Sequence, residues 1–415
     1  MKILVSAYAC ETGRGGEGEI GWRLVHELAR EHDVRVITRA NLRAVHSASF
    51  AEASQQASPR FEYFDLPWIF RFYKKGNRFF LLYYYLWQIG VAFRARRMLR
   101  EEPADVLHHL IGGMDWMPSG LALCSGPFVW GPVGSEDTHP LILRYLPAKS
   151  RLKEAGRRAV RWVMRTLDPF TRLTGARAGV VLSHTPETLP ARLAPKAQAF
   201  TQTGITDHPS LAHPKYDVAR AACLRLVYAG ELKDWKGAHM ALDGALKAFE
   251  RGVEAKLTVI GDGPLRAELE AVALAHPQGH RVRFMGKIPM DRLVETLHGS
   301  DLMIYPTFHH GLATIVLQAM LTRLPIICIE GDAIGRAVGQ EAGITVPLSP
   351  DEVPAEGLAR AIAELAEDEP RRAVLAHAAR EIALKRYSYN VLAGRVSEIY
   401  RDLASLQHRK GVPDA

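Results

Sequence analysis

Residues 305–329, YPTFHHGLATIVLQAMLTRLPIICI, join polar side chains to the start of an apolar helix. His309, His310 and Gly311 precede the run LATIVLQAML, and Gln318 follows His310 by eight residues. Eight residues make about 2.2 helical turns, so His310 and Gln318 would lie within about 80° of each other around the helix. With the backbone N–H groups at the helix start, they could hold two ends of one polar ligand. The alternative is an ordinary helix start with an exposed histidine pair.

Two glycine-containing turns also follow apolar stretches that look like strands. Residues 11–22, ETGRGGEGEIGW, hold five glycines, which would let backbone N–H groups approach an anion at a helix start. They do not form a GxGxxG fingerprint directly after the strand, so NAD binding has weak support. Residues 228–242, YAGELKDWKGAHMAL, place Lys236 beside Gly237 where a helix should begin, which suits a phosphate group. The simpler interpretations are a flexible surface loop and a solvated lysine.

These loops lie between short apolar strands and helical segments along most of the chain. Continuous apolar runs such as KILVSAY, DVRVIT and PFVWG are typical of parallel sheets with helices on both faces. A second series, from LRLVYAG to GITVPL, begins after the hydrophilic stretch 206–217. We therefore predict an α/β fold with two doubly wound domains, residues 1–207 and 208–387, and a C-terminal helix at 388–410 that completes the first domain. In such domains ligands bind at the carboxyl ends of the strands.

The composition is that of a globular protein, with 47% hydrophobic and 24% charged residues among 415. Four scattered cysteines without a CxxC pair indicate buried free thiols in a reducing compartment. We find neither a signal peptide nor an uncharged run near the roughly 20 residues of a membrane span. We therefore expect a cytoplasmic location, with peripheral attachment to the cytosolic face of an inner membrane as a further option. The sequence near these loops contains no carboxylate cluster of the kind that binds a metal ion.

In combination, four segments resemble the retaining family 4 glycosyltransferases: GELKDWKG, VIGDGPLRAEL, VRFMGKIPMDRL and SDLMIYPTFHHGLATIVLQAMLTRLPIICI. The resemblance extends to ACETGRGGEGEIGW near the start and RYSYNVLAGRVSEIY near the end, and so covers nearly the whole chain. It implies a GT-B fold, with two Rossmann-like domains facing a central cleft. The first would bind the acceptor and the second a nucleotide-diphosphate sugar. That sugar nucleotide would be a co-substrate, and the resemblance implies no other cofactor and no metal.

The resemblance also implies roles for individual residues. Lys236 would support the donor diphosphate, and His109 (or His108) would match the histidine near the anomeric carbon. His310 could bond a sugar hydroxyl, and Gln318 the ribose hydroxyls. Further donor contacts would come from a glycine loop, a loop near the base and the loop before the helix: Gly15, Gly16, Gly286, Lys287, Ile288, His309, Gly311, Leu312, Ala313 and Thr314. Lys236 and helix N-termini would stabilise the negative charge of the departing diphosphate.

The chain departs from the family pattern at three positions. His310 and Gln318 replace the usual pair of glutamates, and Glu231 stands where an arginine is usual. The Gln318 amide still donates and accepts hydrogen bonds, whereas Glu231 removes a fixed positive charge from the diphosphate site. Two functions stay open. One is a retaining hexosyltransferase acting on a glycan or lipid-linked acceptor in surface polysaccharide or glycolipid biosynthesis. The other is a weak or inactive homologue that binds a nucleotide sugar or serves as a scaffold.

The surplus positive charge lies in the first half of the chain. Residues 1–200 carry 28 Lys and Arg against 18 Asp and Glu, whereas the remainder carries 25 against 27. Residues 149–177 have nine cations, two acids and an apolar stripe, which suits a helix on an anionic membrane surface or a solvated face over a packed stripe. Residues 71–100 interleave cations with aromatics, and YYYLW within them suits a helix packed in a core. Nucleic acid binding fits the sugar-nucleotide motifs poorly, and an epimerase would need carboxylates for proton transfer.

Overall fold

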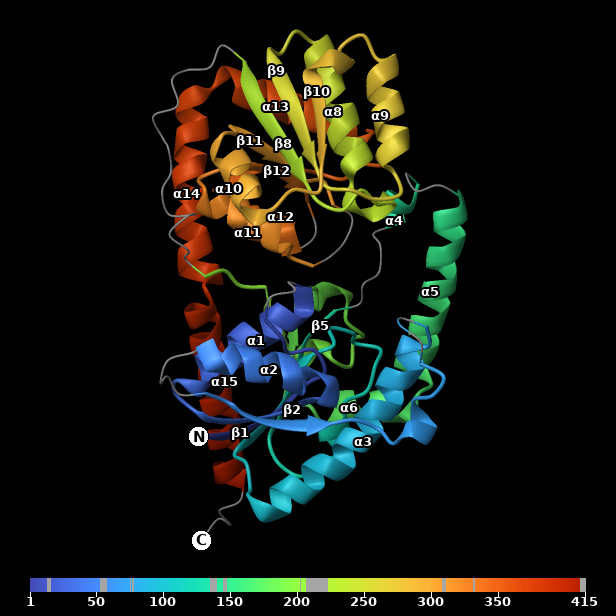
Figure 1. The fold of residues 1–415 in the computed structure, drawn as a ribbon, viewed down its shortest axis with the longest axis vertical. Helices are drawn as coiled ribbons and strands as arrows, with labels where there is room; N and C mark the ends of the chain where they lie inside the picture. The colour runs from blue at the N-terminus through green and yellow to red at the C-terminus, as the bar shows by residue number, and fades with distance from the viewer. Residues whose placement is uncertain are drawn as a thin grey trace. The chain divides into compact units, whose positions relative to one another are not determined.

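The computed structural model of the chain describes residues 1–12, 16–52, 58–74, 76, 78–134, 140–144, 148–201, 203–206, 223–307, 311–330 and 333–410. The chain divides into two compact units, which are drawn together in Figure 1. Unit 1 comprises Met1–Ser135, Gly156–Gln202 and Tyr389–Ala415, and unit 2 comprises Glu136–Ala155 and Thr203–Ser388. The predicted boundary between residues 207 and 208 falls outside the described residues.

Within its described part, unit 1 holds a seven-stranded parallel sheet in the order β3-β2-β1-β4-β5-β6-β7. Strands β1 and β4, which adjoin at the centre, are almost entirely buried because helices cover both faces. The strands are β1 (Lys2–Ala7), β2 (Asp33–Arg39), β3 (Arg60–Phe64), β4 (Val106–Ile111), β5 (Phe128–Val133), β6 (Val180–Ser183) and β7 (Ala197–Ala199).

The helices of unit 1 cover the two faces of its sheet with two separate apolar cores. On one face α1 and α15 pack around Ile3 and Val5 of β1, and on the other face α3 packs around Leu4. Helix α15 ends the chain yet lies beside α1, so the two ends of the sequence meet in one core (Figure 1). The helices are α1 (Gly16–Ala29), α2 (Arg43–Glu52), α3 (Phe80–Glu101), α6 (Pro169–Arg177) and α15 (Tyr389–Lys410), and α5 (Ala148–Thr166) enters unit 1 from unit 2.

Short 3-10 turns connect these elements. They are η1 (Ala40–Leu42), η2 (Trp68–Phe70), η3 (Gly120–Leu123), η4 (Pro186–Thr188) and η5 (Ala194–Lys196). Helix α3 buries Tyr83, Tyr84 and Trp87, which confirms the prediction that YYYLW packs in a core. The four cysteines are free thiols, and three of them are buried.

The described residues of unit 2 form a six-stranded parallel sheet in the order β10-β9-β8-β11-β12-β13. Its strands are β8 (Leu224–Ala229), β9 (Ala255–Ile260), β10 (Val282–Gly286), β11 (Leu302–Ile304), β12 (Ile326–Ile329) and β13 (Gly343–Val346). Its helices and turns are α4 (Pro140–Leu143), η6 (Asp234–Lys236), α8 (Ala238–Glu250), α9 (Arg266–Ala275), η7 (Gly279–Arg281), α10 (Met290–His298), α11 (Thr314–Leu321), α12 (Ala333–Val338), α13 (Pro354–Glu367) and α14 (Glu369–Tyr387).

Both sheets reverse their strand order at one point, between β1 and β4 in unit 1 and between β8 and β11 in unit 2. The predicted α/β class with two doubly wound parallel sheets is therefore confirmed. At such a point the loops that follow two neighbouring strands diverge, which leaves room for a ligand at their carboxyl ends. Among the described residues, no helix is long and apolar enough to cross a bilayer.

The loops at the reversal point of unit 2 touch backbone to backbone. Gly261, directly after β9, has φ +129°, and a Cβ there would lie 1.9 Å from the carbonyl oxygen of Gly230. Only glycine fits both the conformation and the space.

We predict that Gly261→Ala lowers the free energy of unfolding by about 1–3 kcal/mol or more, because it adds a steric clash to backbone strain. Gly156→Ala is the matched control, because Gly156 lies within α5 and a Cβ there would meet nothing within 4 Å. The control should stabilise the chain by about 0.5–1 kcal/mol, since alanine favours a helix interior. Urea unfolding of both variants measures their free energies of unfolding. Equal midpoints for the two variants would contradict the conclusion that only glycine fits at position 261.

Candidate functional site

The turn that carries Lys236 is packed against the segment that follows β11. Gly237 has φ +74°, and a Cβ there would lie 1.9 Å from the carbonyl oxygen of Pro306. The Tyr228 hydroxyl donates a hydrogen bond to the carbonyl of Lys236 at 3.0 Å. The Thr307 hydroxyl donates to the same turn, at 3.2 Å from the carbonyl oxygen of its central residue, Trp235. The loops after β8 and β11 therefore hold Lys236 at the reversal point of the sheet.

Lys236 is a half-buried cation. Burial lowers the pKa of its ammonium group, and the neighbouring Lys233 lowers it further, while Glu231 raises it. Among the described residues, no hydrogen bond or ion pair engages this ammonium group. A cation with reduced solvation and no local partner gains from an anionic ligand, which would stabilise its charged form.

Glu231 stands where the family pattern has an arginine, and its negative charge is balanced by a neighbouring lysine. Its carboxylate forms a 2.6 Å ion pair with Lys233, whose Nζ lies 5.3 Å from the ring centroid of Trp235. The pair is partly exposed and therefore weak, so the Lys233 ammonium can turn to a stronger anion. Sequence reasoning missed Lys233; its position two residues after Glu231, in the same turn as Lys236, is the signal that could have identified it.

The loops after β9 and β10 complete the same edge of the sheet. The Leu232 N–H donates to the carbonyl of Asp262 at 3.0 Å, and the Gly261 N–H donates to that of Gly286 at 2.8 Å. Lys287 is exposed beyond Gly286, and Ile288 packs partly against the core. Because β8, β9 and β10 are parallel neighbours, these backbone bonds bring the predicted base-side residues Gly286, Lys287 and Ile288 to the edge that carries Lys236.

Helix α11 begins at this edge, after an N-cap residue that has no polar side chain. Ala313 at its N-cap has an extended backbone, and no side chain of that residue caps the helix. Leu312 is buried beneath the turn, and Thr314 is exposed at the helix start. The positive end of the helix dipole therefore lies after β11, next to the strand that leads to Lys236. Of the predicted donor loop, Gly311, Leu312, Ala313 and Thr314 are described, whereas His309 and His310 lie outside the described residues.

Gln318 lies one turn into α11 and is only half-buried. Its Nε2 lies 3.7 Å from the Sδ of Met290, at the start of α10. A thioether is a weak acceptor, so the amide keeps most of its capacity to bond a ligand hydroxyl.

Unit 1 brings two histidines to its own reversal point, on opposite faces of β4. The His108 ring donates from Nε2 to the carbonyl of Gly131 at 2.7 Å, so its Nδ1 accepts from the Tyr400 hydroxyl of α15. Both ring nitrogens are thus occupied inside the core. Burial lowers the pKa of His108 to about 4, which keeps the ring neutral.

His109 faces α3 and is 2% exposed. Its Nε2 lies 3.2 Å from the Tyr84 hydroxyl, and its buried Nδ1 has no hydrogen-bond partner among the described residues. Burial, with a contribution from His108, lowers the pKa of His109 to about 3. Of the two histidines that the sequence leaves open, only His109 has a ring nitrogen without a hydrogen-bond partner among the described residues.

The glycine loop of unit 1 is described only in part. Gly15 lies outside the described residues, and Gly16 begins α1 with φ +68° and an exposed position. The Glu11 N–H, before the glycines, donates to the carbonyl of Gly18 in α1 at 3.0 Å, which ties the start of the loop to the helix. Within the part of the chain that the structure describes, no group of three or more His, Cys, Asp or Glu side chains is placed to hold a metal ion.

Because His108 and His109 are buried in the neutral form, we predict that the free energy of unfolding falls in mild acid. An unfolded histidine titrates near pKa 6.5, whereas the folded pKa values of His108 and His109 are about 4 and about 3. Below pH 6.5 the unfolded chain binds protons that the folded chain does not, so stability decreases until the pH reaches the folded values. Each histidine should cost about 2 kcal/mol at pH 5 relative to pH 7.5.

Urea unfolding between pH 5 and pH 7.5 measures this dependence. His109→Gln should show a shallower loss, by about one bound proton. Equal slopes for the parent chain and the His109 variant would show that His109 does not resist protonation.

The comparisons with known sequences point to one family. A model described as glycosyl transferases group 1 matches residues 224–382, which lie in unit 2. The alpha-D-kanosaminyltransferase of Streptomyces kanamyceticus is 24% identical over 43% of this chain and 45% of its own length. The 2-deoxystreptamine glucosyltransferase of the same organism is 22% identical over 61% and 67%. The chain thus matches less than half the length of the first of these relatives.

The comparisons with solved structures extend to the whole fold. Sucrose-phosphate synthase from Thermosynechococcus elongatus is similar over 98% of this chain and 100% of its own, with a TM-score of 0.63 and 16% identity. Anabaena Alr3699/HepE in complex with UDP is similar over 97% and 100%, with a TM-score of 0.61 and 16% identity. The resemblance and the fold predicted from the sequence are confirmed: the chain has the GT-B fold, and its residues 224–382 match the model of the glycosyl transferases group 1 family.

Proposed function

We propose that the chain is a retaining glycosyltransferase that moves a sugar from a nucleotide-diphosphate sugar to a glycan or lipid-linked acceptor. The observation that carries this proposal is the half-buried Lys236 ammonium. This group has no ion-pair partner among the described residues. Lys236 follows β8, and α11 follows the neighbouring strand β11. All of these elements fall within the segment matched by the family model. The names of relatives such as the putative teichuronic acid biosynthesis glycosyltransferase of Bacillus subtilis favour a role in surface polysaccharide or glycolipid synthesis.

The proposed chemistry depends on stabilising a departing diphosphate. Cleavage of the sugar–phosphate bond leaves negative charge on the nucleotide and positive charge on the sugar. Lys236 and the N–H groups at the start of α11 are held in place by the main chain, so they would stabilise that negative charge with little reorganisation. Lys233 would turn from Glu231 to add a second cation. We propose that these groups act without a metal ion and that the nucleotide sugar is the sole co-substrate.

The other predicted residues take the remaining parts of the donor. Gln318 would bond the ribose hydroxyls, and the backbone from Gly286 to Ile288 would lie near the base. His309 and His310 would contact the sugar, and Gly15 and Gly16 of unit 1 the phosphates. His109 would lie near the reacting sugar, with a ring that burial keeps unprotonated.

We also propose a peripheral location on an anionic membrane surface. Helix α5, within the basic stretch 149–177, exposes Leu152, Val160 and Trp162 among its many cations. Exposed apolar side chains argue against a stripe packed in a core and suit an interfacial helix.

Nucleotide binding should depend on Lys236. Thermal unfolding in the presence of UDP, GDP or ADP should shift upward for one base, because a ligand that binds only the folded chain stabilises it by about 2.7 kcal/mol at 100 times its Kd. UDP is tested first, because a structural relative was solved with UDP and with UDP-glucose. Lys236→Ala should abolish the shift. The control is Lys256→Ala, which removes an exposed lysine near the amino end of β9. A shift that survives in Lys236→Ala would place the nucleotide elsewhere.

Slow donor hydrolysis distinguishes an enzyme from a binding homologue. With the correct nucleotide sugar and no acceptor, the parent chain should release sugar whose first-formed anomer matches that of the donor. Lys236→Ala should lower this rate by roughly 100- to 1,000-fold, because it removes a preorganised charge from the leaving group. NMR of the released sugar measures both the rate and the anomer. Nucleotide binding without any release would support the inactive homologue instead.

A further inference from the structure

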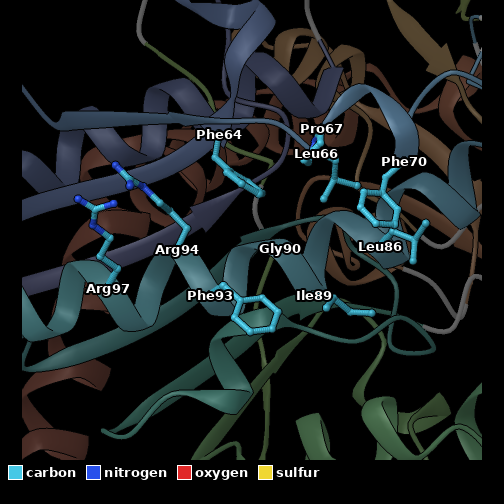
Figure 2. Close-up of a pocket in the computed structure, with 10 residues that line it drawn as sticks. All are labelled: Phe64, Leu66, Pro67, Phe70, Leu86, Ile89, Gly90, Phe93, Arg94 and Arg97. Carbon is cyan, nitrogen blue, oxygen red and sulfur yellow. The ribbon is translucent and has the colours of Figure 1, made fainter.

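Unit 1 has an apolar groove that is separate from its histidines. It lies between α3 and the segment of β3 and η2, and its volume is about 480 Å³. This volume is within the roughly 300–1,000 Å³ of typical small-molecule pockets. Figure 2 shows the residues that line it: Phe64, Leu66, Pro67, Phe70, Leu86, Ile89, Gly90, Phe93, Arg94 and Arg97.

The groove forms because only one face of α3 packs into the core of unit 1. Trp87 and Val91 are buried on that face, while Leu86, Ile89 and Phe93 remain on the outer part of the helix. At Gly90 the two walls come close, and a Cβ there would lie 2.6 Å from the Phe64 ring. The groove is therefore narrow at its centre and is set by the packing of α3 on β3.

The outer edge of the groove is unusually apolar for a surface. Phe93 is 68% exposed, and Trp68 in η2 is 71% exposed. Ile69 and Phe70 are exposed in the same turn, and Phe72, Phe79, Leu81 and Leu82, which follow in the sequence, are exposed as well. Single exposed apolar residues are normal, but a group of this size indicates an interaction surface.

Among the residues that line the groove, the positive charges lie at one end. In Figure 2, Arg94 and Arg97 lie at one end, and Phe70 and Ile89 at the other. Arg94 pairs with Glu62, and Arg97 pairs with Glu101 at 3.0 Å. The Arg97 pair is exposed on both sides, so an arriving anion can exchange for the carboxylate at little cost. A cationic end and an apolar end complement a molecule with an anionic head and a hydrocarbon tail.

We propose that this groove receives one acyl chain of an anionic membrane lipid, with the lipid phosphate at Arg94 and Arg97. Unit 1 would thereby dock on a bilayer, and Trp68, Ile69 and Phe72 would enter the outer layer of the lipids. The proposal concerns a site other than α5 and does not depend on the donor reaction.

Vesicle co-sedimentation of the full chain tests the site. Vesicles of phosphatidylcholine with phosphatidylglycerol should bind the parent chain, and vesicles of phosphatidylcholine alone should bind it more weakly. Phe93→Glu and Phe70→Glu should each weaken binding roughly tenfold or more, because each places a charge in hydrocarbon. Phe93→Leu should retain binding. Arg97→Gln should remove most of the preference for phosphatidylglycerol while leaving the weaker binding intact.

Leu274→Glu is the matched control, because Leu274 is 89% exposed on α9 of unit 2 and lies outside the groove. It should bind vesicles like the parent. Nucleotide-induced thermal shifts should be equal in the parent and in Phe93→Glu, which keeps this test distinct from that of the donor site. Binding lost in Trp162→Glu of α5 but retained in Phe93→Glu and Phe70→Glu would overturn the proposal. A second outcome would also overturn it: the parent chain binds no vesicles but forms a dimer, and Phe93→Glu dissociates that dimer. The surface would then bind a second copy of the chain.

Discussion

Backbone-to-backbone contact at the strand reversal of unit 2 is the constraint on which the donor site depends. Gly237 packs on the carbonyl of Pro306, and Gly261 on that of Gly230, each with room for hydrogen but not for a Cβ. These contacts draw the loops after β8, β9 and β11 into one layer at the sheet edge. As a result, the turn with Lys236 and the helix start of α11 are fixed by the main chain, which suits a site that reads phosphate by charge and N–H groups.

The charges of the two units are arranged in contrasting ways. Unit 2 keeps a cation half-buried at its reversal point, and Lys233 neutralises Glu231, which stands where the family pattern has an arginine. Unit 1 buries His108 and His109 and thereby holds both rings neutral near physiological pH. A neutral acceptor and a preorganised cationic site are the two components that the proposed transfer requires.

Helix α3 links the core of unit 1 to its surface chemistry. Tyr84 reaches His109 from the buried face of the helix, while Phe93 and Arg97 lie on the groove side. One helix therefore contributes to the surroundings of the candidate catalytic histidine and to the proposed lipid site. The aromatic and basic residues within α3 divide between these two faces according to helical spacing.

The sequence by itself determined the features that local patterns specify. Apolar β-branched runs and helical spacing indicated the α/β class and the two series of strands, and glycine or lysine at helix starts indicated the candidate loops. Tertiary structure alone decided which histidine keeps an unpaired ring nitrogen among the described residues, because His108 bonds Tyr400, 292 residues away. It also decided that Glu231 is paired with Lys233 and that α3 and η2 enclose a groove. These outcomes depend on side-chain orientation and on packing between segments distant in sequence, which no local pattern encodes.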